Sequence, residues 1–81
     1  MINVALLGFG RIGQMHAQNI YLNKTLNLLY VYEKIDKLRK KAKSLYNCKI
    51  EKNYNKIFSD EKVDIIFISS PTNTHIRFIE E

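Results

Sequence analysis

The strongest constraint on the fold is a group of three glycines that directly follows a short apolar segment. Residues 2–7 read Ile-Asn-Val-Ala-Leu-Leu, and Gly8-Phe9-Gly10-Arg11-Ile12-Gly13 comes next. A short apolar run that ends at glycine is typical of a strand buried on both faces of a parallel sheet. A helical segment follows to about Leu22, with Ile12, Met15, Ile20 and Leu22 as its apolar residues. The pattern predicts a strand, a glycine turn and a helix, the usual opening of an α/β fold.

The remaining residues continue this alternation of strands and helices. We expect strands over 27–32 and 63–69 and a short one over 48–51. Helices are expected over 35–46, from Asn55 as the N-cap of a brief helix that holds Ile57 and Phe58, and from Thr74 onward. The order is about βαβαβαβα, which predicts a Rossmann-type doubly wound parallel sheet with strand order 3-2-1-4, incomplete at one side.

Composition limits the chain to one small domain and excludes several classes of site. The 81 residues are 46% hydrophobic and 26% charged, which is the balance of a globular chain. The single cysteine, Cys48, excludes a disulfide scaffold, and His16 and His75 are too far apart to suggest a metal site. We find no targeting segment and no apolar run that would span a bilayer, so we expect a cytoplasmic protein without a membrane partner.

The net charge of +5 is concentrated in residues 34–62. A basic block is one signature of nucleic-acid binding. Here no aromatic residues alternate with the lysines as a stacking platform, so a solvated helix face is the favoured interpretation and nucleic acid is not an expected partner.

The spacing Gly-x-Gly-x-x-Gly between a strand and a helix indicates a dinucleotide site. Gly8 would permit the tight turn, Gly10 would let a pyrophosphate approach the backbone, and Gly13 would let the helix pack on the strand. The alternative is a glycine-rich turn without a ligand. Glu33 lies 20 positions after Gly13, where an acidic residue binds the adenosine ribose and favours NAD over NADP. Lys34 beside it is a cation that would instead suit a 2′-phosphate, although an ordinary solvated lysine is the favoured interpretation.

A second part of the site is expected at the end of the strand over 65–68. In a doubly wound sheet this strand lies beside the first one, and ligands bind between them at the carboxyl ends. The loop Ser69-Ser70-Pro71-Thr72-Asn73 would therefore face the glycine turn, with hydroxyl and amide groups available to the nicotinamide ribose. A plain turn built around Pro71 is the alternative.

Taken together, these residues resemble the amino-terminal half of the nucleotide-binding domain of the Gfo/Idh/MocA oxidoreductases. The similarity covers essentially all 81 residues and implies hydride transfer between NAD(P) and a sugar, inositol or related polyol. It implies cofactor-binding roles for two groups of residues. The pyrophosphate turn and ribose site are Gly8, Phe9, Gly10, Arg11, Ile12, Gly13 and Glu33, and the nicotinamide side is Ser70, Pro71, Thr72 and His75.

This sequence departs from the family pattern at two of these positions and lacks its catalytic groups. Glu33 stands where members usually have aspartate, and Thr72 replaces asparagine. The family's Glu-Lys-Pro segment, and the Asp and His of its second domain, are not found here. For His16 and His75 we favour helix-packing or loop-ordering roles over catalysis, because each is expected early on a helix that flanks the sheet. We assign no catalytic residue.

The chain is therefore expected to be a partial NAD(P)-binding domain over 1–81, without a substrate domain and inactive alone. The uncapped ending at Glu80-Glu81 looks like a chain cut inside a helix. Whether this chain is itself an enzyme stays open, and the alternatives are a non-functional remnant of such an enzyme or a basic nucleic-acid-binding module. Ile65–Ile68 would form an exposed sheet edge, through which self-association is expected.

Overall fold

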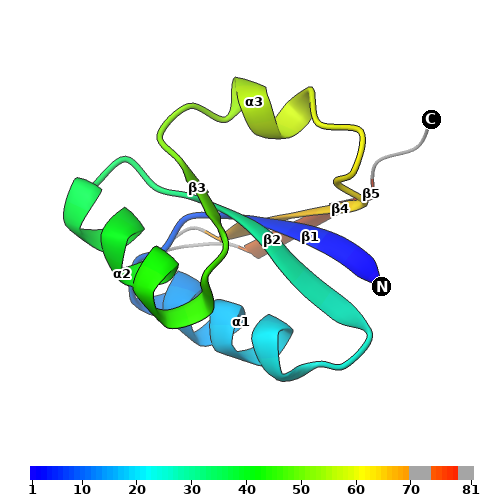
Figure 1. Cartoon of the computed structure of the whole chain (residues 1–81), viewed down its shortest axis with the longest axis horizontal. Coiled ribbons are helices and arrows are strands. Elements are labelled where there is room, and N and C mark those ends of the chain that lie inside the picture. The colour runs from blue at the N-terminus through cyan, green and yellow to red at the C-terminus, as the bar shows by residue number, and fades with distance from the viewer. Residues whose placement is uncertain (70–73, 79–81) are drawn as a thin grey trace.

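The computed structural model describes residues 1–69 and the backbone of residues 74–78. The elements follow in the order β1 (Ile2–Leu7), α1 (Arg11–Leu22), β2 (Leu26–Tyr32), α2 (Asp36–Tyr46), β3 (Lys49–Glu51), α3 (Asn55–Phe58), β4 (Ile65–Ser69) and β5 (Thr74–Phe78) (Figure 1). The predicted strands and the first three helices are present, with bounds that differ by one or two residues.

The strands form a single sheet in the order β3-β2-β1-β4-β5. Its first four strands are parallel, which confirms the predicted order 3-2-1-4. In the register of the sheet, Leu6 of β1 stands opposite Val31 of β2 and Phe67 of β4. The carboxyl ends of β1, β2 and β4 therefore meet at one edge of the sheet.

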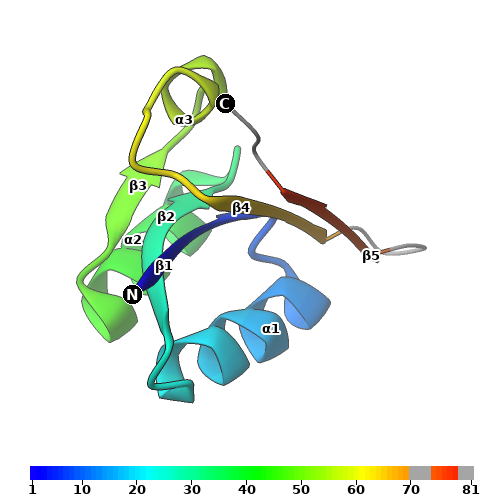
Figure 2. The ribbon, with the colours of Figure 1, turned by 90° about the vertical axis from the view of Figure 1, so that its right-hand side faces the viewer.

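Helices cover both faces of the sheet, and each face has its own hydrophobic core. α1 and α2 lie on one face and the short α3 on the other (Figure 2). The core under α1 and α2 contains Val4, Leu6, Phe9, Ala17, Ile20, Leu28, Val31, Ala42 and Cys48. The core under α3 contains Ala5, Tyr30, Ile57, Val63 and Ile66. β1 is buried on both faces, as its continuous apolar run predicted.

The helix predicted from Thr74 is wrong, because residues 74–78 form the strand β5. β5 is antiparallel to β4, with Ile66 opposite Arg77 and Ile68 opposite His75. β4 is thus paired on both sides, and the exposed edge predicted at Ile65–Ile68 is also wrong. An edge strand has a row of unpaired N–H and C=O groups, and a nearby segment that pairs with it as a strand satisfies them. A two-turn helix has little intrinsic stability to set against this pairing.

The buried face of α1 also differs from its apolar pattern. The helix buries Gly13, Ala17 and Ile20, whereas Ile12 and Leu22 are exposed. Two of these three buried residues are small, and Gly13 lies so close to the Gly8 carbonyl that a Cβ would overlap it. The brief helix begins at Asn55 and has Tyr54 in the N-cap position, so the prediction that Asn55 is the N-cap is wrong.

Among the residues that the structure describes, no helix has the length and apolar character needed to cross a membrane.

Candidate functional site

The turn between β1 and α1 brings the glycines against the ends of the neighbouring strands. Gly8 has a φ angle of 109°, and a Cβ there would lie 2.5 Å from the carbonyl oxygen of Ser69. A Cβ on Gly13 would overlap the carbonyl oxygen of Gly8. Both neighbours are backbone atoms, which cannot move aside as a flexible side chain can. The predicted tight turn at Gly8 and the close helix approach at Gly13 are therefore confirmed.

Gly10 lies at the start of α1 and leaves the space beside it open. A Cβ at this position would meet nothing within 4 Å, and no described side chain caps the helix. The first turn of α1 contains no acidic residue, so its unpaired N–H groups and the positive end of the helix dipole favour an anion. This open surface with its N–H donors fits the pyrophosphate of a dinucleotide.

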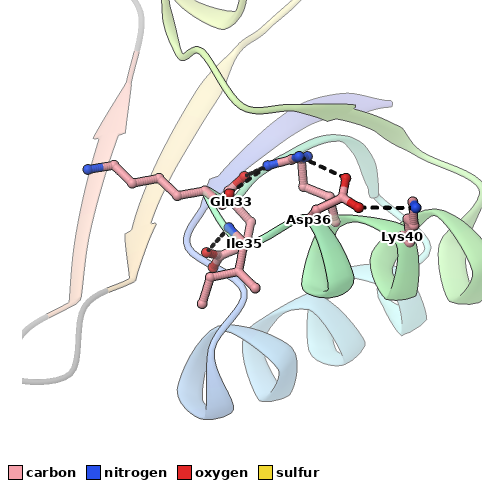
Figure 3. Close-up of polar contacts among 6 residues, drawn as sticks. Glu33, Ile35, Asp36 and Lys40 are labelled. Atoms are coloured by element: carbon pink, nitrogen blue, oxygen red, sulfur yellow. Dashed lines mark hydrogen bonds and ion pairs between the residues drawn. The ribbon is translucent and has the colours of Figure 1, made fainter.

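Glu33 follows the last residue of β2, and its carboxylate lies beside the glycine turn. Oε1 accepts a hydrogen bond from the Phe9 N–H at 2.8 Å. Oε2 accepts one from the Ile35 N–H at 3.1 Å (Figure 3). The Glu33 N–H donates to the Glu51 carbonyl oxygen at 3.1 Å, which holds the strand end in place. Each carboxylate oxygen retains acceptor capacity for a hydroxyl group. The ribose-binding candidate and the phosphate-binding candidate thus belong to one site.

Phe9 contributes to this site through its backbone. Its side chain is fully buried in the core, where its ring makes a T-shaped contact with the ring of Tyr46, with centroids 6.3 Å apart. Its carbonyl oxygen accepts a hydrogen bond from Gln14 Nε2 at 3.2 Å. Gln14 was not among the predicted site residues, because a glutamine one turn into a helix gives no distinctive sequence signal.

Arg39 of α2 forms hydrogen bonds with the segment that connects β2 to α2, residues 33–36. Nη1 donates to the carbonyl oxygens of Glu33 and Lys34 at 2.7 and 2.8 Å, and Nη2 donates to Asp36 Oδ1 at 2.9 Å. Asp36 also pairs with Lys40 at 3.0 Å, and Lys40 is the main reason that the pKa of Asp36 is lowered. The spacing of Asp36 and Arg39 is compatible with a pair on one helix face. This spacing does not predict that Arg39 also contacts the carbonyl oxygens of Glu33 and Lys34.

β4 brings its carboxyl end to the same turn. The Ser69 carbonyl oxygen lies beside Gly8, and Ser69 Oγ would be 3.7 Å from a Cβ on Gly13. The predicted placement of this strand end opposite the glycine turn is therefore confirmed. Ser70, Pro71, Thr72 and Asn73 lie outside the described residues. Of His75 the structure gives only its backbone place in β5, so the nicotinamide-side roles stay predictions.

The two histidines occupy different kinds of element. His16 is half-buried on α1, and its ring stacks at a tilt on that of Phe67, with centroids 4.7 Å apart. This contact confirms the helix-packing role expected for His16. His75 lies in β5 and not at the start of a helix, so the basis for the same role there is wrong.

Comparison with known proteins agrees with this geometry. The sequence model of a family described as "Oxidoreductase family, NAD-binding Rossmann fold" matches residues 2–81. This chain belongs to the Gfo/Idh/MocA family. The resemblance inferred from the glycine turn, Glu33 and the downstream loop is thereby confirmed, and the chain is an NAD-binding Rossmann domain of that oxidoreductase family.

Relatives within the Gfo/Idh/MocA family include inositol dehydrogenases. The myo-inositol 2-dehydrogenase of Thermotoga maritima is 30% identical over 80 residues, which are 96% of this chain and 24% of that protein. The solved structure of a putative myo-inositol dehydrogenase from Sinorhizobium meliloti has a TM-score of 0.82 at 26% identity and covers 89% of this chain and 22% of its own.

The scyllo-inositol dehydrogenase of Lactobacillus casei, solved with NAD(H) and scyllo-inositol, shares the fold, with a TM-score of 0.79 at 23% identity, and covers 88% of this chain and 22% of its own. This chain spans about a quarter of the length of the curated relatives that it matches.

Proposed function

We propose that this chain binds NAD at the β1–α1 turn, as part of an enzyme that transfers hydride between the nicotinamide and a sugar, inositol or related polyol. The observation that carries the proposal is the hydrogen bond from the Phe9 N–H to Glu33 Oε1, because it joins the two halves of a dinucleotide site. The names of the relatives support the substrate class, since inositol dehydrogenases are among them.

Each part of the proposed site has a distinct role. The N–H groups at the start of α1 would bind the pyrophosphate, whose approach needs the open space at Gly10. Glu33 would accept hydrogen bonds from the adenosine ribose. Ser70, Pro71, Thr72 and His75 are proposed to line the nicotinamide side. The bound cofactor supplies the hydride acceptor or donor, and the residues of this chain hold it in place.

Glu33 also favours NAD over NADP in this proposal. Its carboxylate would repel a 2′-phosphate at the ribose position that it binds. Arg39 is engaged with two carbonyl oxygens and Asp36, so its guanidinium is held away from a phosphate role. Lys34 is exposed and forms no ion pair with any described residue. It is the cation that would oppose this preference.

The proposed contribution of the chain is binding without turnover. Oxidation of an alcohol needs a group that accepts its proton as the hydride leaves. The described residues of this site bind and orient the cofactor, and none of them is assigned that role. We therefore propose that residues 1–81 are part of the nucleotide-binding domain of a larger enzyme, and that this chain does not oxidise polyols by itself.

Titration of the purified chain with NAD and with NADP by isothermal calorimetry tests the proposal. We expect binding of NAD in preference to NADP, and loss of NAD binding in Gly10→Val, whose side chain would enter the open space. Gln18→Val, at an exposed position of the same helix, is the matched control and should bind as the wild type does. Binding that survives Gly10→Val would refute the turn as the phosphate site, and a preference for NADP would refute the role given to Glu33.

A further inference from the structure

We propose that Arg39 is a positioning residue, which holds the segment after β2 so that the Glu33 carboxylate faces the ribose. This inference rests on the proposed function and extends it to a residue that does not itself touch the cofactor. It identifies a determinant of ribose recognition on α2, beyond the glycine turn and the strand end.

The contacts of Arg39 explain how it would act. The side chain is 13% exposed, and one nitrogen of its guanidinium donates to two consecutive carbonyl oxygens, those of Glu33 and Lys34. The second nitrogen donates to Asp36 Oδ1, at the start of α2. A single planar group thus connects the end of β2 with the first turn of α2.

The braced segment contains one of the two donors that orient the carboxylate. Phe9 on the glycine turn holds Oε1, and Ile35 holds Oε2 from within the segment spanned by Arg39. If Arg39 releases the carbonyl oxygens of Glu33 and Lys34, the Ile35 N–H is no longer kept in place. The carboxylate then keeps one fixed donor and gains freedom to rotate. A hydrogen bond to a ribose hydroxyl becomes weaker because ordering the carboxylate now opposes binding.

The chemistry of this contact requires arginine. A guanidinium presents several N–H donors in a fixed plane, so it reaches two carbonyl oxygens and a carboxylate at once. A lysine has one ammonium nitrogen and cannot reproduce that bridge from the same position. Arg39→Lys therefore keeps the charge and removes the bridge, which separates positioning from general electrostatics.

The test compares ADP with 2′-deoxy-ADP by calorimetry on the 81-residue chain. Both probes contain the adenine and the pyrophosphate, and they differ by one ribose hydroxyl. We expect the wild type to bind ADP about tenfold more tightly than 2′-deoxy-ADP, the size expected for a hydrogen bond to a charged group. In Arg39→Met and Arg39→Lys this ratio should fall to about two, while the affinity for 2′-deoxy-ADP changes by less than about twofold. Lys40→Met, which removes the other partner of Asp36, is the matched control and should keep the wild-type ratio.

The outcomes distinguish a failure of the Arg39 positioning role from a failure of the proposed NAD-binding function. If the wild type discriminates between the probes and both Arg39 variants do so equally well, the positioning role is refuted and the proposed function stands. If the variants lose affinity for both probes by the same factor, Arg39 serves the general fold and the positioning role is again refuted. If the wild type does not bind ADP at all, the proposed function fails and the positioning role fails with it.

Discussion

Replacement of Gly13 by alanine should destabilise this protein, although alanine is normally the better residue inside a helix. Gly13 lies in the first turn of α1, where the helix crosses the end of β1. A Cβ at this position would overlap the carbonyl oxygen of Gly8 and lie 2.8 Å from the carbonyl carbon, inside the 3.0 Å limit that real Cβ contacts essentially never cross. The helix and the turn must therefore move apart to admit one methyl group.

The size of the effect follows from two opposing contributions. Alanine in place of glycine favours a helix by about 1 kcal/mol. Overpacking of a close contact costs about 1–3 kcal/mol, and the upper value applies because both sides are backbone. The net loss is about 2 kcal/mol, which corresponds to a fall in the melting temperature of about 8–16 °C for a domain of this size.

Urea unfolding followed by far-ultraviolet circular dichroism measures this loss. The matched control is Gly10→Ser, because a Cβ at Gly10 meets nothing within 4 Å and serine is a good N-cap residue. Its free energy of unfolding should lie within about 0.5 kcal/mol of the wild-type value, or above it. A Gly13→Ala variant as stable as the wild type would show that α1 does not rest on the Gly8 carbonyl, and the close helix–strand contact would have to be abandoned.

Two further predictions concern the core under α3. Tyr30 donates a 2.6 Å hydrogen bond to Asp60, and this bond, together with burial, raises the pKa of Tyr30 from 10.0 to about 12. The pKa of Tyr30 is higher in the folded state than in the unfolded state, so the protonated hydroxyl stabilises the fold. This contribution to the free energy of unfolding is complete below pH 10 and is lost between pH 10 and 12. The stability advantage of the wild type over Tyr30→Phe should therefore shrink across that range in urea titrations, and an advantage independent of pH would contradict the assignment. Ile57 is fully buried and is the buried residue of α3, so Ile57→Ala should lower the free energy of unfolding by about 2–5 kcal/mol. A loss below about 1 kcal/mol in the same assay, with the exposed Lys56→Ala as control, would show that α3 is not anchored through this side chain.

The local sequence pattern was sufficient to predict the features that depend on residues close together in the chain. The apolar run before Gly8 predicted a strand buried on both faces, and the three glycines predicted a turn into a helix. The position of Glu33 followed from the spacing of the second strand after this turn. These features combine into the parallel order 3-2-1-4 because right-handed crossovers leave few other topologies.

The sequence by itself therefore determined the order of the elements, the glycine turn and the acidic residue that follows β2. The tertiary structure alone decided that residues 74–78 pair with β4 as a strand and that Arg39 reaches the carbonyl oxygens of Glu33 and Lys34. The physical reason is the range of the interactions. Periodicity and turn chemistry act over a few residues, whereas the pairing of a sheet edge and the partners of a guanidinium depend on which backbone groups the fold brings within reach.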